Sequence, residues 1–136
     1  MNNIEQTLSI IKPDAVERNL DNEIKEIFKS KGFKILKEKK ILIEKSEAEK
    51  FYKVHEAKPF YNDLCAYLSS GPIVVMILEK DNAVIDNRKL MGATNPKEAD
   101  EGAIRKKFGI SIDKNSVHGS DSVENAKIEI DFFFKD

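Results

Sequence analysis

The sequence predicts an α+β fold of the ferredoxin-like βαββαβ type, in which a four-stranded antiparallel sheet carries helices on one face. The order of the expected elements leads to this prediction. Strand-like and helix-like segments follow one another in the order strand, helix, strand, strand, helix, strand. Extra helical segments and a long irregular stretch interrupt that order, so we also expect an inserted helical hairpin and a long loop. No repeat or linker divides the chain, and residues 1–136 are expected to form a single domain.

The first part of the chain predicts two strands with a helix between them. Residues 6–12 alternate apolar and polar side chains, and Pro13 ends this strand because proline cannot donate to a sheet ladder. Residues 22–31 carry apolar side chains at helical spacing and stop at Gly32, as a helix terminus does. Residues 33–43 predict a second strand whose apolar side chains share one face, and its lysine-rich middle indicates a sheet edge.

A helical hairpin and a buried strand are expected next. The first hairpin helix begins at Ser46, where Glu49 three residues on suggests a capping box, and the second covers residues 61–70. Two helices inserted between strands are typical of a lid over a cleft. Residues 73–78 form a continuous apolar run rich in β-branched side chains, which predicts a central strand buried on both faces.

The last third contains the predicted long loop and the last strand. Residues 83–91 predict a helix, and residues 92–112 predict a long loop with a short helix near residues 104–108. A brief helix is expected after the second histidine. Residues 127–134 then alternate apolar and polar side chains, which predicts the final strand.

Composition and charge exclude several classes of protein. The chain has 23 basic and 24 acidic residues, so no overall field attracts it to nucleic acid or to a membrane surface. Cys65 is the only cysteine, so no internal disulfide forms and a reducing compartment fits. The first residues contain no apolar signal run, and the longest apolar run is too short to span a bilayer. We therefore expect a cytoplasmic protein with no membrane partner and no specific nucleic-acid partner.

Residues 115–122 are the first candidate for chemistry because they contain His118, one of two histidines. A neutral imidazole is a good nucleophile near pH 7. Gly119 follows, and glycine is typical where backbone approaches a ligand closely or takes a positive φ. Ser120 and Asp121 can donate or accept hydrogen bonds around an anion, and Asp121 can also begin the brief helix. The residue types alone leave open a structural, hydrogen-bonded histidine.

Other candidate groups are scattered over predicted turns and strand ends. Arginine offers bidentate donors suited to phosphate and lysine a point charge, although each alone is more often a solvated surface charge. Phe60 is either a core aromatic or a platform for a base, and its residue type alone favours the core. Glu129 either orients His118 by accepting a ring N–H or is an ordinary solvent-facing residue of a strand. The cations and donors are Lys12, His55, Arg88, Thr94, Arg105 and Asn115.

Common catalytic motifs do not occur. The sequence contains no Walker A motif, no G-x-G-x-x-G, no H-E-x-x-H and no G-x-S-x-G. With one cysteine, a zinc site is not expected either.

The spacing of the candidate residues resembles that of the nucleoside diphosphate kinase family. Residues 115–122 match the family signature N-x-x-H-G-S-D-S. Further matches follow in family order at residues 11–14, 31–33, 55, 59–60, 70–72, 88, 91–96, 102, 104–105 and 108. The resemblance therefore covers almost the whole chain.

The resemblance implies a role for each matching position. His118 is implied to be the nucleophile, phosphorylated on Nδ1, and Glu129 to hold the other ring nitrogen. Lys12 and Asn115 are implied to touch the ribose hydroxyls, with Lys12 also near the transferred phosphate. The remaining implied roles are phosphate contacts at His55, Arg88, Thr94 and Arg105, a stacking aromatic at Phe60, borders of the base at Leu64 and Ile112, and a tyrosine near the histidine at Tyr52.

The resemblance also implies an activity. Similar enzymes transfer the γ-phosphate of a nucleoside triphosphate, such as ATP, to a nucleoside diphosphate by a ping-pong mechanism through the phosphorylated histidine. They need Mg²⁺ bound with the nucleotide's phosphates, not held by protein side chains alone. They form homo-oligomers, either tetramers or hexamers.

Two alternatives to this activity remain. One is a catalytically idle scaffold that binds nucleotides or regulates a partner, against which the intact set of His118, Lys12, Arg88 and Arg105 argues. The other is a hydrolase or phosphatase using the histidine with a serine, against which the missing nucleophile elbow argues.

The sequence departs from the family pattern at three positions. Glu101 and Ala103 stand where the family usually has proline and threonine, and Lys107 replaces a common acidic residue. These changes leave the catalytic residues intact. We expect them to alter the rigidity of the long loop and the contacts between subunits.

Overall fold

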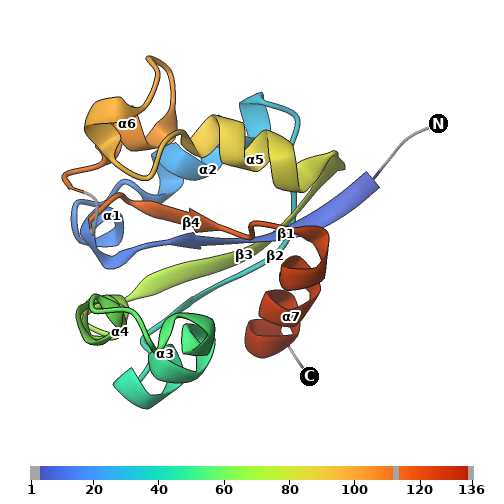
Figure 1. Cartoon of the computed structure of the whole chain (residues 1–136). Coiled ribbons are helices and arrows are strands. Elements are labelled where there is room, and N and C mark those ends of the chain that lie inside the picture. The colour runs from blue at the N-terminus through green and yellow to red at the C-terminus, as the bar shows by residue number, and fades with distance from the viewer. Residues whose placement is uncertain (1–3, 112–113, 135–136) are drawn as a thin grey trace.

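A four-stranded antiparallel sheet forms the centre of the fold (Figure 1). The computed structural model describes residues 4–111 and 114–134. The strands are β1 (Ile4–Ile11), β2 (Lys34–Ile41), β3 (Ile73–Asp81) and β4 (Val117–Gly119). Their order across the sheet is β2-β3-β1-β4, which places the apolar strand β3 in the centre and the lysine-rich strand β2 at an edge. This arrangement confirms the predicted ferredoxin-like fold class.

Helices cover both faces of this sheet (Figure 1). One side carries α1 (Pro13–Glu17), α2 (Asp21–Ser30), α5 (Ala83–Met91) and α6 (Ile104–Phe108). The other side carries the hairpin helices α3 (Lys45–Phe51) and α4 (Tyr61–Leu68), together with α7 (Val123–Phe134). Short 3₁₀ turns lie at Lys53–His55 and Pro96–Glu98. Because β1 and β3 contribute buried side chains to both faces, the fold has two apolar cores separated by the sheet.

The C-terminal segment is a helix and not the predicted strand. Ala126, Ile130 and Phe133 recur at helical spacing and pack toward the sheet, whereas Ile128 is 67% exposed. The strand prediction for residues 127–134 was wrong because the segment carries apolar side chains at spacings that suit both a strand and a helix. The fourth strand is instead β4, which pairs antiparallel with β1.

A β-bulge changes the faces of β2. Ile35 and Lys37 pair with consecutive residues of β3, so Leu36 is an extra residue between them. Ile35 consequently packs in the core on the α2 side, while Ile41 packs in the core on the hairpin side. The prediction that all apolar residues of this strand share one face was wrong, because one inserted residue reverses every side chain after it.

The first hairpin helix begins earlier than predicted. Its capping box is formed by Glu44 and Glu47, and the Glu47 carboxylate accepts the backbone N–H of Glu44 at 3.4 Å. The sequence did not predict the cap at Glu44, because the residues that favour a helix N-cap are serine, threonine, aspartate and asparagine.

Candidate active site

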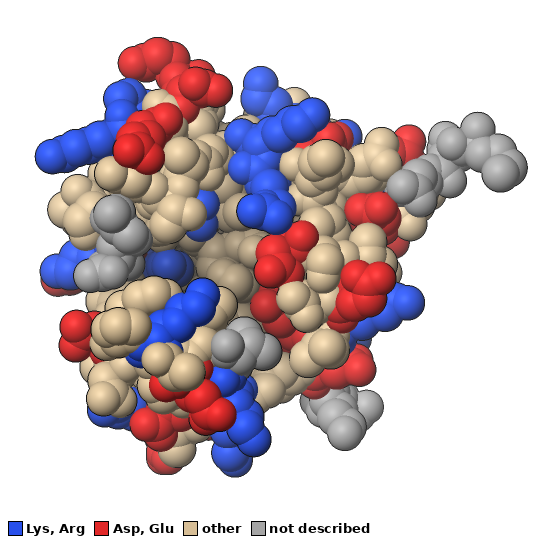
Figure 2. Space-filling view, viewed as in Figure 1, with Lys and Arg blue, Asp and Glu red and all other residues tan. Residues whose placement is uncertain are grey.

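A cleft of about 470 Å³ lies where the hairpin faces the long loop and β4. Figure 2 shows a hollow in this face of the molecule, with Lys and Arg side chains at its edge. The side chains that line it all belong to the predicted site, although they come from segments far apart in the sequence. They are Lys12, Tyr52, His55, Phe60, Leu64, Thr94, Arg105, Asn115 and His118.

Volume alone does not select this cleft. A larger groove of about 1010 Å³ runs beside α1 and α4, with Pro13, Arg18, Tyr67 and Lys114 among its lining residues. Of the predicted site residues that the structure describes, none lines that groove. The smaller cleft is therefore the candidate site because of its chemistry.

His118 lies in β4, and one nitrogen of its ring is held by a carboxylate. Its Nε2 is 3.2 Å from Oε1 of Glu129 on α7. An ionised carboxylate only accepts hydrogen bonds, so this contact places the ring proton on Nε2 and leaves a lone pair on Nδ1. The Phe51 ring lies 5.4 Å from the imidazole, centroid to centroid, at 75° to its plane. Sequence reasoning did not identify Phe51, whose only signal was its place beside Tyr52 on a predicted helix.

Ser120 hydrogen-bonds Glu129 and, contrary to the prediction, does not face the cleft. Its side chain is completely buried. The hydroxyl donates to Oε1 of Glu129 at 2.7 Å and accepts the backbone N–H of Leu8 at 3.3 Å. The prediction missed this contact because it placed Glu129 on a strand, whereas helix α7 returns the carboxylate to the start of its own segment.

Gly119 allows α5 to approach β4 closely. A Cβ at this position would lie 2.3 Å from Nδ2 of Asn87 and 2.8 Å from the terminal methyl of Met91. A larger residue here would have to displace these two side chains, so the packing of α5 on β4 favours glycine. The positive φ in this loop belongs to Ser116, at 74°.

Asp121 adjoins the start of α7, as predicted for the beginning of a helix. It is exposed, and its carboxylate accepts from the side-chain amide of Asn125 at 2.6 Å. The cap itself comes from Ser122, whose hydroxyl accepts the backbone N–H of Asn125 at 3.1 Å.

Lys12 and Asn115 form a buried polar pair at the cleft. Their exposed fractions are 6% and 2%, and Nζ of Lys12 donates to Oδ1 of Asn115 at 2.9 Å. The Asn115 amide in turn donates to the carbonyl of Thr94 at 3.1 Å. Pro13 occupies the first position of α1, where its missing N–H is not needed, so β1 ends at Ile11 and Lys12 projects from the strand end.

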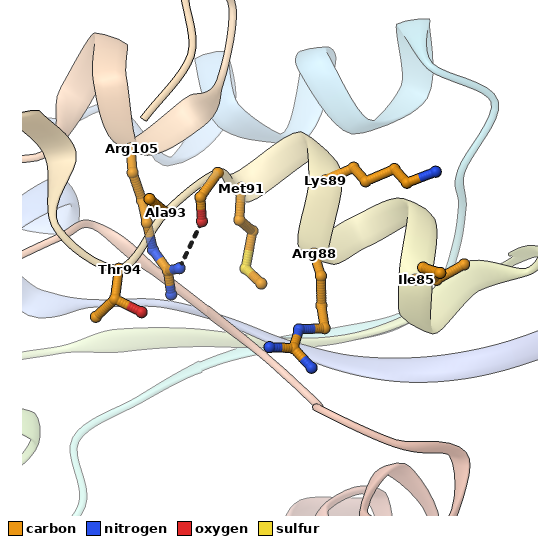
Figure 3. A pocket seen from close by; sticks show the side chains of 8 residues that line it. Ile85, Arg88, Lys89, Met91, Ala93, Thr94 and Arg105 are labelled. Carbon is orange, nitrogen blue, oxygen red and sulfur yellow. Dashed lines mark hydrogen bonds between the residues drawn. The ribbon is translucent and has the colours of Figure 1, made fainter. Parts of the chain in front are cut away.

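Arg105 is a partly buried cation whose hydrogen-bond partners are backbone carbonyls. Its guanidinium donates to the carbonyls of Gly92 and Val117, each at 3.0 Å, and Figure 3 shows the first of these bonds. Its Nε is buried and has no hydrogen-bond partner among the described residues. Burial, and next the positive charge of Arg88, lowers the pKa of Arg105 to about 10, so the side chain stays cationic at neutral pH. The positive charge is thus available to an anionic ligand.

Arg88 lines an adjoining hollow of about 370 Å³ that shares Thr94 and Arg105 with the cleft. In Figure 3, the side chains of Arg88 and Arg105 extend to the same side of α5, whereas Lys89 points away from them. The Arg88 guanidinium donates to the carbonyl of Asp121 at 3.3 Å. The structure therefore brings both predicted arginines to one side of the site.

The hairpin supplies the aromatic wall of the cleft. Phe60 is 46% exposed and is therefore not a core residue, which is the alternative that its residue type alone favoured. Nδ1 of His55 is buried and lacks a hydrogen-bond partner in the described part of the chain. Burial, and then the negative charge of Glu129, raises the pKa of Tyr52, so its hydroxyl stays protonated at neutral pH. The predicted position Ile112 lies outside the described residues.

The donor set suits phosphate and not a metal held by the protein alone. Within residues 4–111 and 114–134, no group of three or more His, Cys, Asp or Glu side chains converges as metal ligands would. The cleft offers cations, amides and hydroxyls, and the carboxylate of Glu129 is engaged by His118 and Ser120. A divalent cation that arrives bound to nucleotide phosphates is compatible with this set.

Nearly the whole chain matches one family model. The model for nucleoside diphosphate kinase matches residues 5–136. The chain belongs to the nucleoside diphosphate kinase family. This membership confirms the resemblance drawn from the sequence motifs.

Individual nucleoside diphosphate kinases are similar over nearly their full length. The enzyme of Campylobacter fetus subsp. fetus is 59% identical over 131 residues, covering 96% of each chain. The one of Geobacter sulfurreducens is 56% identical over 131 residues, again covering 96% of each chain. An orthorhombic crystal structure of the Aquifex aeolicus nucleoside diphosphate kinase has a TM-score of 0.95 at 39% identity, covering 96% of this chain and 95% of that one.

Proposed function

We propose that this chain transfers the γ-phosphate of a nucleoside triphosphate to a nucleoside diphosphate through a phosphorylated His118. One observation carries the proposal. Glu129 holds Nε2 of the imidazole, so the lone pair on Nδ1 belongs to a ring that lines a cationic cleft. A histidine nucleophile divides the transfer into two half-reactions, which gives ping-pong kinetics.

In the first half-reaction, Nδ1 attacks the γ-phosphorus of the triphosphate. The Nδ1–P bond forms, the bond from phosphorus to the bridging oxygen breaks, and the diphosphate leaves with that electron pair. The ring becomes positively charged, and the Glu129 carboxylate at Nε2 stabilises this charge. In the second half-reaction, a terminal oxygen of another diphosphate attacks the same phosphorus, the Nδ1–P bond breaks, and its electron pair returns to Nδ1, which restores the neutral ring.

The cations of the site stabilise the charge of the transferred phosphoryl group. Phosphoryl transfer depends mainly on positioning and electrostatic stabilisation. Arg105 supplies a partly buried positive charge, and Arg88 supplies a second from the adjoining hollow. Lys12 brings an ammonium to the cleft beside Asn115, where the sugar hydroxyls are proposed to bind.

The base is proposed to stack on Phe60, with Leu64 beside it. Both side chains line the cleft, and Phe60 is exposed enough to be covered by a ring. Stacking recognises the face of a base and not its hydrogen-bonding edge, so bases are discriminated poorly. We therefore expect the chain to accept several nucleoside diphosphates.

Mg²⁺ is proposed to enter with the nucleotide and to be held mainly by its phosphates. When bound, it neutralises phosphate charge. The protein contributes the cations around the phosphates, at Lys12, Arg88 and Arg105.

The assembly and the compartment remain proposals that rest on family membership. We propose a homo-oligomer, either a tetramer or a hexamer, which mass measurement of the native protein distinguishes. We also propose a cytoplasmic location, where nucleoside triphosphates are abundant. In the part of the chain that the structure describes, no helix has the length and apolar character needed to cross a membrane.

A catalytically idle scaffold is disfavoured by the cleft itself. Such a protein has no use for an imidazole held at one nitrogen by a carboxylate, whereas the partly buried Arg105, whose Nε lacks a partner among the described residues, suits nucleotide binding in either case. Buried polar groups without partners are costly, so their retention here supports a ligand-binding site.

The proposal is tested with ATP labelled on its γ-phosphate. The purified protein with Mg²⁺ should form an acid-labile, base-stable phosphoprotein that loses its label when GDP is added. The His118→Ala variant should form none, whereas His55→Ala should retain the label at higher ATP concentrations. Absence of label, or label that persists in His118→Ala, would overturn the proposed function.

A further inference from the structure

The buried carboxylate of Asp14 has no role in the chemistry above, yet it accepts three side-chain hydrogen bonds. Its side chain is 3% exposed. Oδ2 accepts from the guanidinium of Arg18 at 3.1 Å and from the hydroxyl of Ser116 at 2.8 Å. Oδ1 accepts from the hydroxyl of Tyr67, which also accepts the backbone N–H of Asp14 at 2.9 Å. Each of these partners belongs to a different segment of the chain.

The segments joined at Asp14 are those that carry the cleft residues. Tyr67 is on α4 of the hairpin, and Ser116 lies in the loop that enters β4. Arg18 follows α1 and also donates to the carbonyl of Phe108, at the end of α6, at 2.6 Å. Each of these segments also carries residues that line the cleft. They are Leu64 on α4, Asn115 and His118 on either side of Ser116, Lys12 just before α1, and Arg105 on α6.

Ser116 is the link nearest to the reacting groups. Its φ of 74° is uncommon for a residue other than glycine. Its carbonyl accepts the backbone N–H of Lys12 at 2.8 Å, while its hydroxyl is held by Asp14. The residues on its two sides are Asn115, which bonds Lys12 in the cleft, and Val117, whose carbonyl bonds Arg105. A shift of Ser116 therefore moves three groups of the site together.

The network is built to persist at neutral pH. Burial, and next the hydrogen bond to the Asp14 carboxylate, raises the pKa of Tyr67, so its hydroxyl remains a donor. In the low dielectric of a buried site, hydrogen bonds to an ionised group are stronger than those between neutral groups.

We propose that Asp14 is a positioning residue for phosphoryl transfer, which acts through Ser116 to hold Asn115 and His118 in register with Lys12. This inference rests on the proposed function, because it assumes that His118 is the phosphorylated group. Asp14 is not among the residues that line the cleft, and it lies instead beside the larger groove.

The test compares Asp14→Asn with a matched control. Asparagine has the same shape but removes the charge and one acceptor. The control is Asp86→Asn, which removes the partner of Lys80 at 2.6 Å in another partly buried ion pair outside the site. Because a misplaced catalytic group can cost about a hundredfold in rate, we expect Asp14→Asn to lower the rate constant for His118 phosphorylation about ten- to a hundredfold. The dissociation constant for ADP should change less than about threefold, because ground-state binding needs less exact alignment than the transition state.

A double variant tests the path through Ser116. Ser116→Gly removes the hydroxyl but still permits the positive φ. If Asp14 acts through Ser116, Asp14→Asn combined with Ser116→Gly should be no slower than Ser116→Gly alone, because coupled positions are not additive. Independent, additive losses would contradict the proposed path.

Other outcomes separate this inference from the proposed function. A wild-type protein that forms no phosphohistidine overturns the proposed function itself. A labelled wild type with an equally fast Asp14→Asn variant overturns only the inference, as does an equal loss of rate in Asp86→Asn. If Asp14→Asn does not fold, Ser116→Gly and Tyr67→Phe decide the question, and unchanged phosphorylation rates in both would overturn the inference.

Discussion

Nε2 of His118 on β4 lies 3.2 Å from Oε1 of Glu129 on α7, and the same oxygen accepts the hydroxyl of Ser120 at 2.7 Å. A strand and the helix that follows it thus hold one imidazole through a single carboxylate. The contact determines which ring nitrogen carries the proton, and so which one has the lone pair. It is the structural basis for the proposed nucleophile.

Glu129→Gln should slow phosphorylation of His118 by about 10²- to 10⁴-fold, since glutamine no longer stabilises the charged ring. The side-chain amide can also donate to Nε2, which would place the ring proton on Nδ1. Nucleotide binding should change much less, because Glu129 does not line the cleft. Stopped-flow phosphorylation and equilibrium titration measure the two effects. Glu124→Gln, an exposed change on the same helix, is the control, and an unchanged rate in Glu129→Gln would remove this residue from the mechanism.

Phe60→Ala should raise KM about tenfold for every nucleoside diphosphate, because base stacking contributes about 1–3 kcal/mol per base. Steady-state kinetics with several bases measure this effect. Phe60→Tyr should behave nearly as the wild type, since it keeps the ring. Leu42→Ala removes another exposed apolar side chain, 67% exposed, and should change nothing. A rise in KM for only one of the bases would indicate recognition of the hydrogen-bonding edge of that base instead of stacking.

Gly119→Ala should lower the free energy of unfolding by about 1–3 kcal/mol, as overpacking of a core does. The added methyl would meet the side chains of Asn87 and Met91 at under 3 Å. Gly71→Ala is the matched control, because its added Cβ would meet Cβ of Pro13 at an ordinary 3.6 Å. Urea denaturation of both variants gives the comparison. Equal stability of the two would contradict the packing role of Gly119.

Alkaline pH should unfold the chain as buried tyrosines ionise. Burial is the main cause that raises the pKa of Tyr52 and Tyr67. A raised pKa in the folded chain favours the neutral phenol, so its stabilisation is complete below the ordinary tyrosine pKa of about 10 and is lost at higher pH. The chain has three tyrosines and no tryptophan, so ultraviolet absorbance reports tyrosinate clearly. We expect most tyrosinate to form together with the loss of helical circular dichroism. Ionisation of all three tyrosines in a chain that keeps its helical circular dichroism would contradict this prediction.

The candidate site was more predictable from sequence than the fold around it. Lys12 before Pro13 and His118 before Gly119 are local patterns that match the family's motifs, and their roles are implied by that resemblance and not by residue type alone. The structure brings both to one cleft, together with the predicted aromatic Phe60.

Features that depend on contacts between distant segments were not predictable in this way. The apolar spacing of α7 suits either a strand or a helix, and packing of Phe133 against the sheet decides between them. The reason for Gly119 lies on α5, at Asn87. The network at Asp14 depends on Tyr67, for which the sequence carried no signal beyond an aromatic residue on a helix.

The position of the phosphate on the protein tests the central claim most directly. The wild-type protein is phosphorylated with ATP and Mg²⁺, freed of nucleotide, and its linkage is assigned by ³¹P NMR under denaturing, alkaline conditions. Because Glu129 holds Nε2, we expect one phosphohistidine with phosphorus on Nδ1 of His118. Phosphate on Nε2, on a serine or on His55 would contradict the account.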